Sequence, residues 1–198
     1  MTATTAFRNP LADDPAFAAA RELVASGGLG QLLAVYAVAR ARDPLPDPLA
    51  ALGLPLIEEI VGTLGENPAT VTAVRTGEPG GFEHWSLVLA FPSGVRATVD
   101  LGAGLGPAQA AVLDLRVEWS GSERVILVDP TNVAVTVMNG GGIHRRSAEV
   151  SPIADKLFAP TAPLPPVFSY PPPAWQYARL VITAARESAG SGTPTRVL

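Results

Sequence analysis

The two histidines of this chain, His84 and His144, are its only side chains that normally titrate near neutral pH. His84 follows Glu83 at the start of the apolar segment WSLVLAF, where a histidine can act as a base but is usually a solvated polar residue. His144 precedes Arg145 and Arg146, and this trio suits an anion such as phosphate or carboxylate. The same trio is equally typical of an exposed edge strand protected by charge. Neither histidine alone indicates a catalytic site.

Other residue patterns exclude several kinds of site. The chain has no cysteine, which excludes disulfides, iron–sulfur clusters, thiolate nucleophiles and cysteine-ligated zinc. The histidines lie about sixty residues apart with no carboxylates at ligand spacing, so we expect no metal site. No G-x-S-x-G motif occurs, which argues against a hydrolase of that type. Glu58 and Glu59 are adjacent, and adjacent helix residues point about 100° apart, so they do not naturally form an acid–base pair.

Composition predicts one soluble globular domain spanning 1–198. Of the 198 residues, 47% are hydrophobic and the net charge is only −4, which excludes a disordered chain and disfavours nucleic-acid binding. The N-terminus does not resemble a signal peptide, so we expect a cytoplasmic location. The long uncharged stretch Leu157–Ala178 is rich in proline and predicts a loop, not a membrane span.

Helix signals occur in three places. Asp13 and Asp14 precede Pro15, and helical spacing of apolar residues then continues to Gly27. A second helix is predicted over Pro55–Leu64, ending at Gly65, and a third over Ala174–Ser188. Trp175 and Tyr177 in the third helix suit either sugar stacking or anchoring to the core. We expect 1–9 and 190–198 to be flexible.

Strand signals fill much of the remaining sequence. Leu32–Ala39 is a run of small and branched apolar residues, and from Ala69 apolar and polar residues alternate through a series of segments joined by short turns. The pattern predicts an α+β fold with one large, mostly antiparallel sheet of six to eight strands and about three helices on one face. Segments such as RVILVD and VAVTVM carry few charges on either side, so we expect the uncovered sheet face to form a homodimer.

The order of these segments resembles the C-terminal domain of the Gfo/Idh/MocA oxidoreductases, the glucose-fructose oxidoreductase and inositol dehydrogenase family. The resemblance spans roughly Pro10–Gly192 and is carried by DPAFAAARELVASGGLGQLLAV, LIEEIVGTLGENPATVTAV, WSLVLAFPSGVRATVDL and LRVEWSGSERVILVD. It implies a dihydrodipicolinate-reductase-like domain. Members of the family carry an N-terminal Rossmann domain that binds the nicotinamide cofactor and ends in a catalytic lysine, and neither has a counterpart here, because the only lysine is Lys156 in the late loop.

The resemblance also locates the family's catalytic H-x-x-D motif, which here falls on Pro55 and Glu58. Proline cannot transfer a proton, so the inherited relay is broken, whereas Glu58 keeps a carboxylate that can bind a sugar or polyol hydroxyl. We therefore expect no catalytic residue and a ligand pocket of Glu58, with His84 or Arg96 within reach. The alternative is that Glu58 is an ordinary exposed helix carboxylate. The glycines Gly140–Gly142 and the run LGAGLGP lie among strands, so this chain alone should bind no cofactor.

Three functions remain open from the sequence. The chain is a non-catalytic dimerisation or small polar ligand-binding module, or the substrate-binding subunit of an oxidoreductase whose Rossmann domain, and with it NAD(P), comes from a separate protein. In the third reading it is a degenerate remnant without activity. We expect neither nucleic acid nor membrane among its partners.

Overall fold

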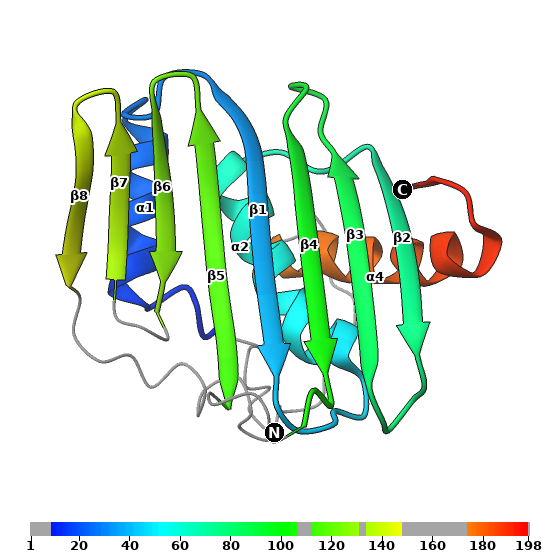
Figure 1. Cartoon of the computed structure of the whole chain (residues 1–198). Helices are drawn as coiled ribbons and strands as arrows, with labels where there is room; N and C mark the ends of the chain where they lie inside the picture. The colour runs from blue at the N-terminus through cyan, green and yellow to red at the C-terminus, as the bar shows by residue number, and fades with distance from the viewer. Residues whose placement is uncertain (1–8, 107–111, 131–133, 148–173, 198) are drawn as a thin grey trace, which may run out of the picture.

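A single twisted sheet with helices on one face makes up the structure, a computed structural model that describes residues 9–106, 112–130, 134–147 and 174–197 (Figure 1). The opposite face, turned toward the viewer in Figure 1, carries no described helix. The α+β class and the helices on one face are therefore as predicted. No helix among the described residues is long and apolar enough to cross a membrane.

The sheet has nine strands in the order β8-β7-β6-β5-β1-β4-β3-β2-β9. Every neighbouring pair is antiparallel except β1 and β4, which run parallel. The strands are β1 (Leu32–Ala41), β2 (Thr70–Gly77), β3 (Glu83–Ala90), β4 (Arg96–Ala103), β5 (Leu113–Gly121), β6 (Arg124–Asp129), β7 (Ala134–Asn139), β8 (Gly142–Ser147) and β9 (Thr195–Arg196).

Among the described residues, three α-helices cover the rear face: α1 (Pro15–Ala25), α2 (Leu54–Leu64) and α4 (Ala174–Ser191). Asp14 caps α1 by accepting a hydrogen bond from the Ala16 amide (2.9 Å), and α2 ends at Gly65, whose φ of 66° is left-handed. Both ends are those predicted. A π-helical turn, η1 (Leu49–Gly53), leads into α2.

The hydrophobic core lies between the helices and the sheet. Helix α1 packs against β6 and β7, while α2 and α4 pack against each other and α4 against β2. Alternate residues of the central strands point into this layer and are almost fully buried, among them Ala37, Val99, Leu87, Leu101, Val117 and Trp119. The period-two pattern of the sequence therefore marks the buried face correctly.

Two features differ from the sequence expectation. Strand β1 inserts between β4 and β5 and so divides the series of strands that follows Ala69, an order that the hydrophobic pattern does not encode. The tail expected to be flexible is held in place: β9 pairs with β2, and the buried Ser188 hydroxyl accepts the Ala73 amide (3.0 Å) and donates to the Thr193 carbonyl (2.7 Å). At the other end 1–8 lie outside the described residues, whereas the Asn9 side chain is buried and donates to the Pro55 carbonyl (2.9 Å).

Candidate functional site

Glu58 lies on α2, on the helical side of the sheet, and is partly buried. Its Oε2 atom is inaccessible to solvent and has no hydrogen-bond partner within the described part of the chain. Burial first, and then the neighbouring Glu59 carboxylate, raise the pKa of Glu58 to about 7. The alternative of an ordinary exposed carboxylate is therefore wrong, because one oxygen of this group is buried and has no partner among the described residues.

Glu59 is buried and has a structural role. Arg21 of α1 donates through Nη1 to both Glu59 oxygens (2.7 and 2.8 Å), and the Thr63 hydroxyl donates to Oε1 (3.3 Å). Burial raises the pKa of Glu59, while Arg21 and Thr63 partly oppose the rise. The pair joins α1 to α2, so the two adjacent carboxylates have separate tasks, as their angular separation on the helix implies.

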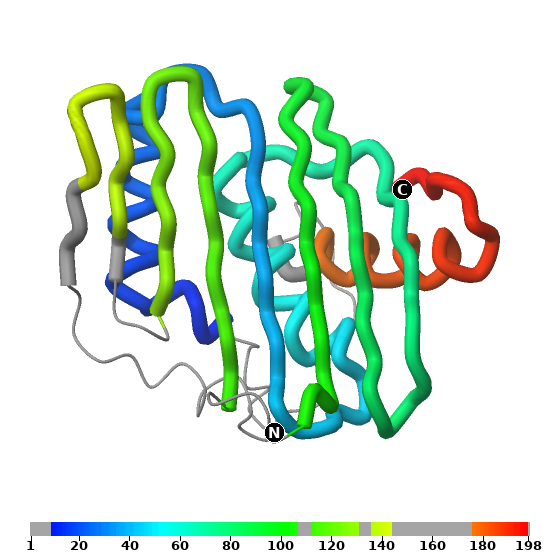
Figure 2. The backbone as a smooth tube through the Cα atoms, viewed as in Figure 1, coloured from blue at the N-terminus to red at the C-terminus, as the bar shows by residue number. Residues whose placement is uncertain are grey.

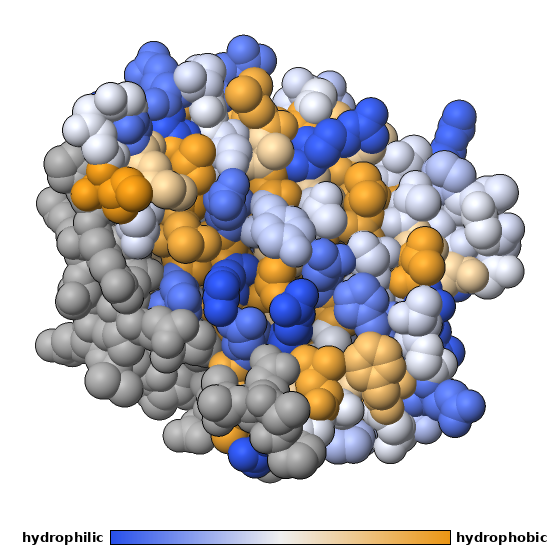
Figure 3. All heavy atoms as spheres, in the orientation of Figure 1, coloured by the Kyte–Doolittle hydropathy of each residue, from blue (hydrophilic) through white to orange (hydrophobic). Residues whose placement is uncertain are grey.

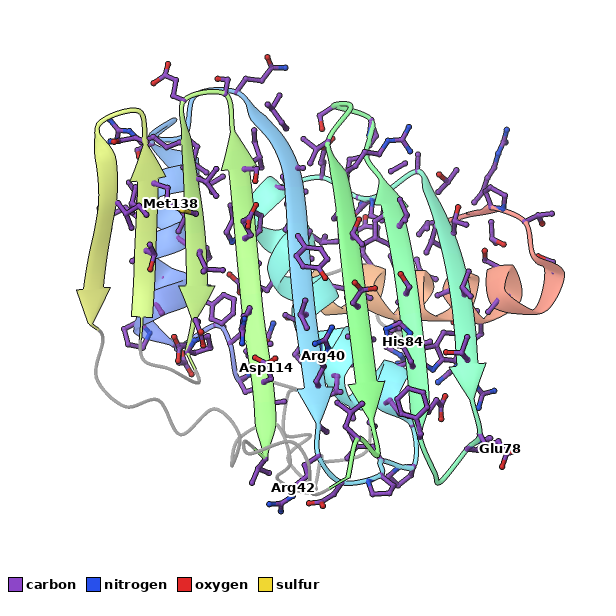
Figure 4. The ribbon with its side chains drawn as sticks, in the orientation of Figure 1. Arg40, Arg42, Glu78, His84, Asp114 and Met138 are labelled. Carbon is purple, nitrogen blue, oxygen red and sulfur yellow. The ribbon has the colours of Figure 1, made fainter. Side chains whose placement is uncertain are left out.

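His84 and Arg96 lie on the other side of the sheet from Glu58. His84 pairs with Gly102 across β3 and β4, and Arg96 pairs with Ala34, so both project from the face that carries no described helix (Figure 4). The central sheet separates them from α2, which packs on the rear face (Figure 1). The structure does not bring the three predicted pocket residues together.

The uncovered face, hereafter the open face, has a charged centre that the sequence reading missed. Asp114, Arg116 and Glu118 alternate along β5, and β1 brings Tyr36 and Arg40 beside them. Figure 3 shows hydrophilic side chains over the middle of this face and hydrophobic ones over β6 to β8. The alternating segment LDLRVEW already shows these charges in the sequence. The predicted apolar character holds for β6 to β8, and Val88 of β3 is a further exposed apolar residue on this face.

Ion pairs and hydrogen bonds order this centre around a hollow of about 310 Å³. Arg116 Nε lies 3.0 Å from Asp114 Oδ1 and 3.8 Å from Asp129 Oδ2, and the Tyr36 hydroxyl donates to Asp100 Oδ2 (3.0 Å). Burial, followed by the Asp100 carboxylate, raises the pKa of Tyr36 above its ordinary value. The open face thus presents both signs of charge within a few strands.

The remaining candidates add no site. In residues 9–106, 112–130, 134–147 and 174–197 no three His, Asp or Glu side chains cluster as metal ligands. The side chains of His144, Arg145, Arg146 and Trp175, and all of Lys156, lie outside the described part. Tyr177 packs against the core, which agrees with the anchoring interpretation. Gly140 and Gly141 form the turn between β7 and β8, and Gly142 begins β8, so all three lie among strands as expected.

Comparison with known proteins finds relatives by structure alone. No protein-family model and no curated protein matches the chain. An oxidoreductase from Agrobacterium radiobacter, solved with NAD+, L-tartaric acid and magnesium, matches with a TM-score of 0.74 and 15% identity, over 96% of this chain and 64% of that one. An NAD-binding oxidoreductase from Klebsiella pneumoniae matches with a TM-score of 0.73 and 14% identity, over 96% and 65%. A super-repressor mutant of Gal80p from Saccharomyces cerevisiae matches with a TM-score of 0.70 and 13% identity, over 99% and 65%.

These matches cover nearly all of this chain but only part of each matched chain. Nearly all of this chain is covered, but it spans only about 61 to 65% of the chains it matches. At such low identity the matches show the fold. The chain therefore has the fold of the C-terminal domain of Gfo/Idh/MocA-type oxidoreductases, as its sequence resemblance predicted.

Proposed function

We propose that this chain is a non-catalytic module that pairs with a second copy of itself through the open face. The observation that carries the proposal is the open face itself, a broad sheet surface that no described helix covers (Figure 1). Tyr36 (43% exposed), Val88 (39%) and Ile143 (71%) project from it. Exposed apolar and aromatic side chains spread over one sheet face favour association with another protein.

The charges at the centre of the open face favour a second copy over an unrelated partner. A two-fold axis brings the same patch of both copies together, so a patch must complement itself. Here Arg40 and Arg116 lie beside Asp100, Asp114 and Glu118, so rotation about an axis near β1 and β5 brings arginines of one copy close to carboxylates of the other. The exposed Tyr36 at the same place is the residue type that often dominates such interfaces.

Reversing one of these charges tests the proposal. We expect the wild-type chain to have twice its own mass in multi-angle light scattering at low micromolar concentration. Arg116→Glu should weaken the dimer at least about tenfold, because the symmetry places each like-charge contact in the interface twice. The double variant Arg116→Glu, Glu118→Arg keeps the charge balance and should regain part of the affinity.

The matched control is Arg124→Glu, which makes the same reversal at an exposed residue on the rear side of the sheet. The dimer of this variant should have the same dissociation constant as the wild-type dimer. A monomeric wild type at tens of micromolar, or an equal response to the Arg116 and Arg124 reversals, contradicts pairing through the open face.

A second candidate is a substrate-binding subunit that works with a separate dinucleotide-binding protein. Two observations favour it: Glu58 retains a carboxylate where the related family has its acidic residue, and the fold matches part of a levoglucosan dehydrogenase solved with NADH and levoglucosan. The match to Gal80p favours the first candidate, the non-catalytic module, because the solved form of Gal80p is named as a super-repressor mutant and not as an oxidoreductase.

Dinucleotide binding separates the two candidates. No strand–helix–strand unit with a glycine-rich turn occurs in the described residues, so nothing there orders amides around a pyrophosphate. We expect calorimetry to detect no micromolar binding of NAD or NADP by the isolated chain. Capture of a Rossmann-domain protein by the tagged chain, with NAD binding restored in the complex, would favour the second candidate.

A further inference from the structure

A second hollow, on the rear side of the sheet, is separate from the open face. It has a volume of about 530 Å³ and lies between the end of α4, the β2–β3 hairpin and the segment after β1. Figure 2 shows that segment turning at the lower edge of the sheet and passing behind β4 and β3 toward α2. Its lining includes Asp47, Arg75, Pro79, Glu83, Trp85 and Arg186. We call this hollow the rear pocket.

One wall of the rear pocket is a fixed polar cluster on β2 and β3. Glu83 is 3% exposed, and its Oε1 accepts the Trp85 indole N–H (2.7 Å). Arg75 Nε lies 3.0 Å from the same oxygen, and the Arg75 guanidinium carbon lies 5.4 Å from the centre of the Trp85 ring. The aromatic ring and the buried carboxylate together hold the Arg75 guanidinium at the pocket surface.

The facing wall carries a second arginine held in the same manner. Arg186 of α4 donates through Nη2 to Asp47 Oδ2. Asp47 Oδ1 accepts the Ala50 amide (3.1 Å), so the carboxylate is fixed at the start of η1. Asp47 and Arg186 are 139 residues apart in sequence, and their contact closes one side of the rear pocket.

The rear pocket offers more donors than acceptors. Each guanidinium has five N–H groups, yet among the described residues Arg75 has one anionic partner, Glu83 at Nε, and Arg186 has one, Asp47 at Nη2. Both Asp47 oxygens are already engaged, and Glu83 is buried. Two guanidinium groups with unused donors favour a ligand rich in acceptors, which a carboxylate supplies with two oxygens in matching geometry.

The size of the rear pocket narrows the ligand further. Its volume lies within the range of about 300 to 1,000 Å³ that is typical of small-molecule sites. An inorganic ion would leave most of this space to water, whereas an organic body would also contact Pro79 and Trp85. We propose that the rear pocket binds a small organic carboxylate, with its carboxylate group contacting Arg75 and Arg186.

The test uses D-gluconate as the probe and the Trp85 indole N–H resonance as the reporter, because that N–H donates to Glu83 at the pocket wall. Titration of the wild-type chain should shift this resonance with saturation. Neutral D-glucose should bind at least about tenfold more weakly, because it lacks the charge that a guanidinium recognises. Arg186→Gln and Arg75→Gln should each weaken gluconate binding at least about tenfold for the same reason.

The matched control is Arg96→Gln, which removes a guanidinium from the open face and should leave gluconate binding unchanged. Arg186→Gln is the decisive variant, because Arg186 and Asp47 are both about half exposed and the fold does not depend on their pair. Arg75→Gln leaves the buried Glu83 without its ion pair, so its melting curve must be recorded alongside. Absence of a saturable shift in the wild type, glucose binding as tightly as gluconate, or unchanged binding by a folded Arg186→Gln each overturns the proposal.

Discussion

Glu58→Gln should stabilise the protein by roughly 2 kcal/mol at pH 8 and leave its stability nearly unchanged at pH 4.5. Burial and Glu59 raise the pKa of Glu58 from 4.5 in the unfolded chain to about 7 in the folded protein. The folded state therefore binds more protons than the unfolded state between these values, and wild-type stability falls as pH rises from about 4.5 to 7. A glutamine stays neutral at every pH, so the variant does not lose this stability as pH rises.

Each unit of pKa shift corresponds to about 1.4 kcal/mol at most. The stabilisation expected of Glu58→Gln is smaller than the full shift implies, because solvent screens a partly exposed group. Urea denaturation of both proteins at pH 4.5, 6 and 8, at one fixed concentration, measures it. Glu22→Gln is the control, since it removes an exposed carboxylate of α1 that burial does not desolvate. Parallel pH profiles for wild type and Glu58→Gln would contradict the burial of an unpartnered carboxylate.

Gly77→Ala should destabilise the protein by about 3 kcal/mol or more, the largest effect expected of any single methyl group here. Gly77 ends β2 with a φ of 91°, and a Cβ there would lie 2.0 Å from the Phe82 carbonyl oxygen. That oxygen accepts the Glu78 amide (2.8 Å) and closes the β2–β3 hairpin (Figure 4), so the backbone cannot yield without losing the bond.

Gly80→Ala in the same hairpin separates the effect of a left-handed φ from the effect of a steric contact. Gly80 also has a left-handed φ of 77°, but a Cβ there meets no atom within 4 Å. Gly80→Ala should therefore lower the free energy of unfolding by only about 1 kcal/mol, because an alanine is unfavourable at this φ. Denaturant unfolding of both variants gives the comparison, and equal losses would show that conformation rather than contact governs the hairpin.

Local sequence signals predicted the elements well. The Asp14 cap and Pro15 start α1, and the left-handed Gly65 ends α2, because caps and glycines act within a single turn. The predicted series of alternating segments joined by short turns includes the hairpin from β3 to β4, whose short loop contains Gly94. Such features depend on residues a few positions apart, which a sequence displays directly.

Features that depend on distant residues could not be predicted. The rear pocket needs Asp47, Glu83 and Arg186, which only the completed fold brings together. The predicted set of Glu58, His84 and Arg96 is divided by the sheet, because assigning a strand does not say which of its two faces meets a given helix. The charged residues of β5 are evident in the sequence, but the charged centre of the open face forms only because β1 pairs with β5.

The position of β1 also constrains how the protein folds. Ala37 pairs with both Val99 and Val117, so neither central ladder can form until the ribosome has synthesised at least those residues. Pairings of such large sequence separation form slowly, and an apolar strand awaiting its partners is prone to misassociation. We therefore expect the nascent segment Leu32–Ala41 to be the part of the chain that chaperones need most to protect.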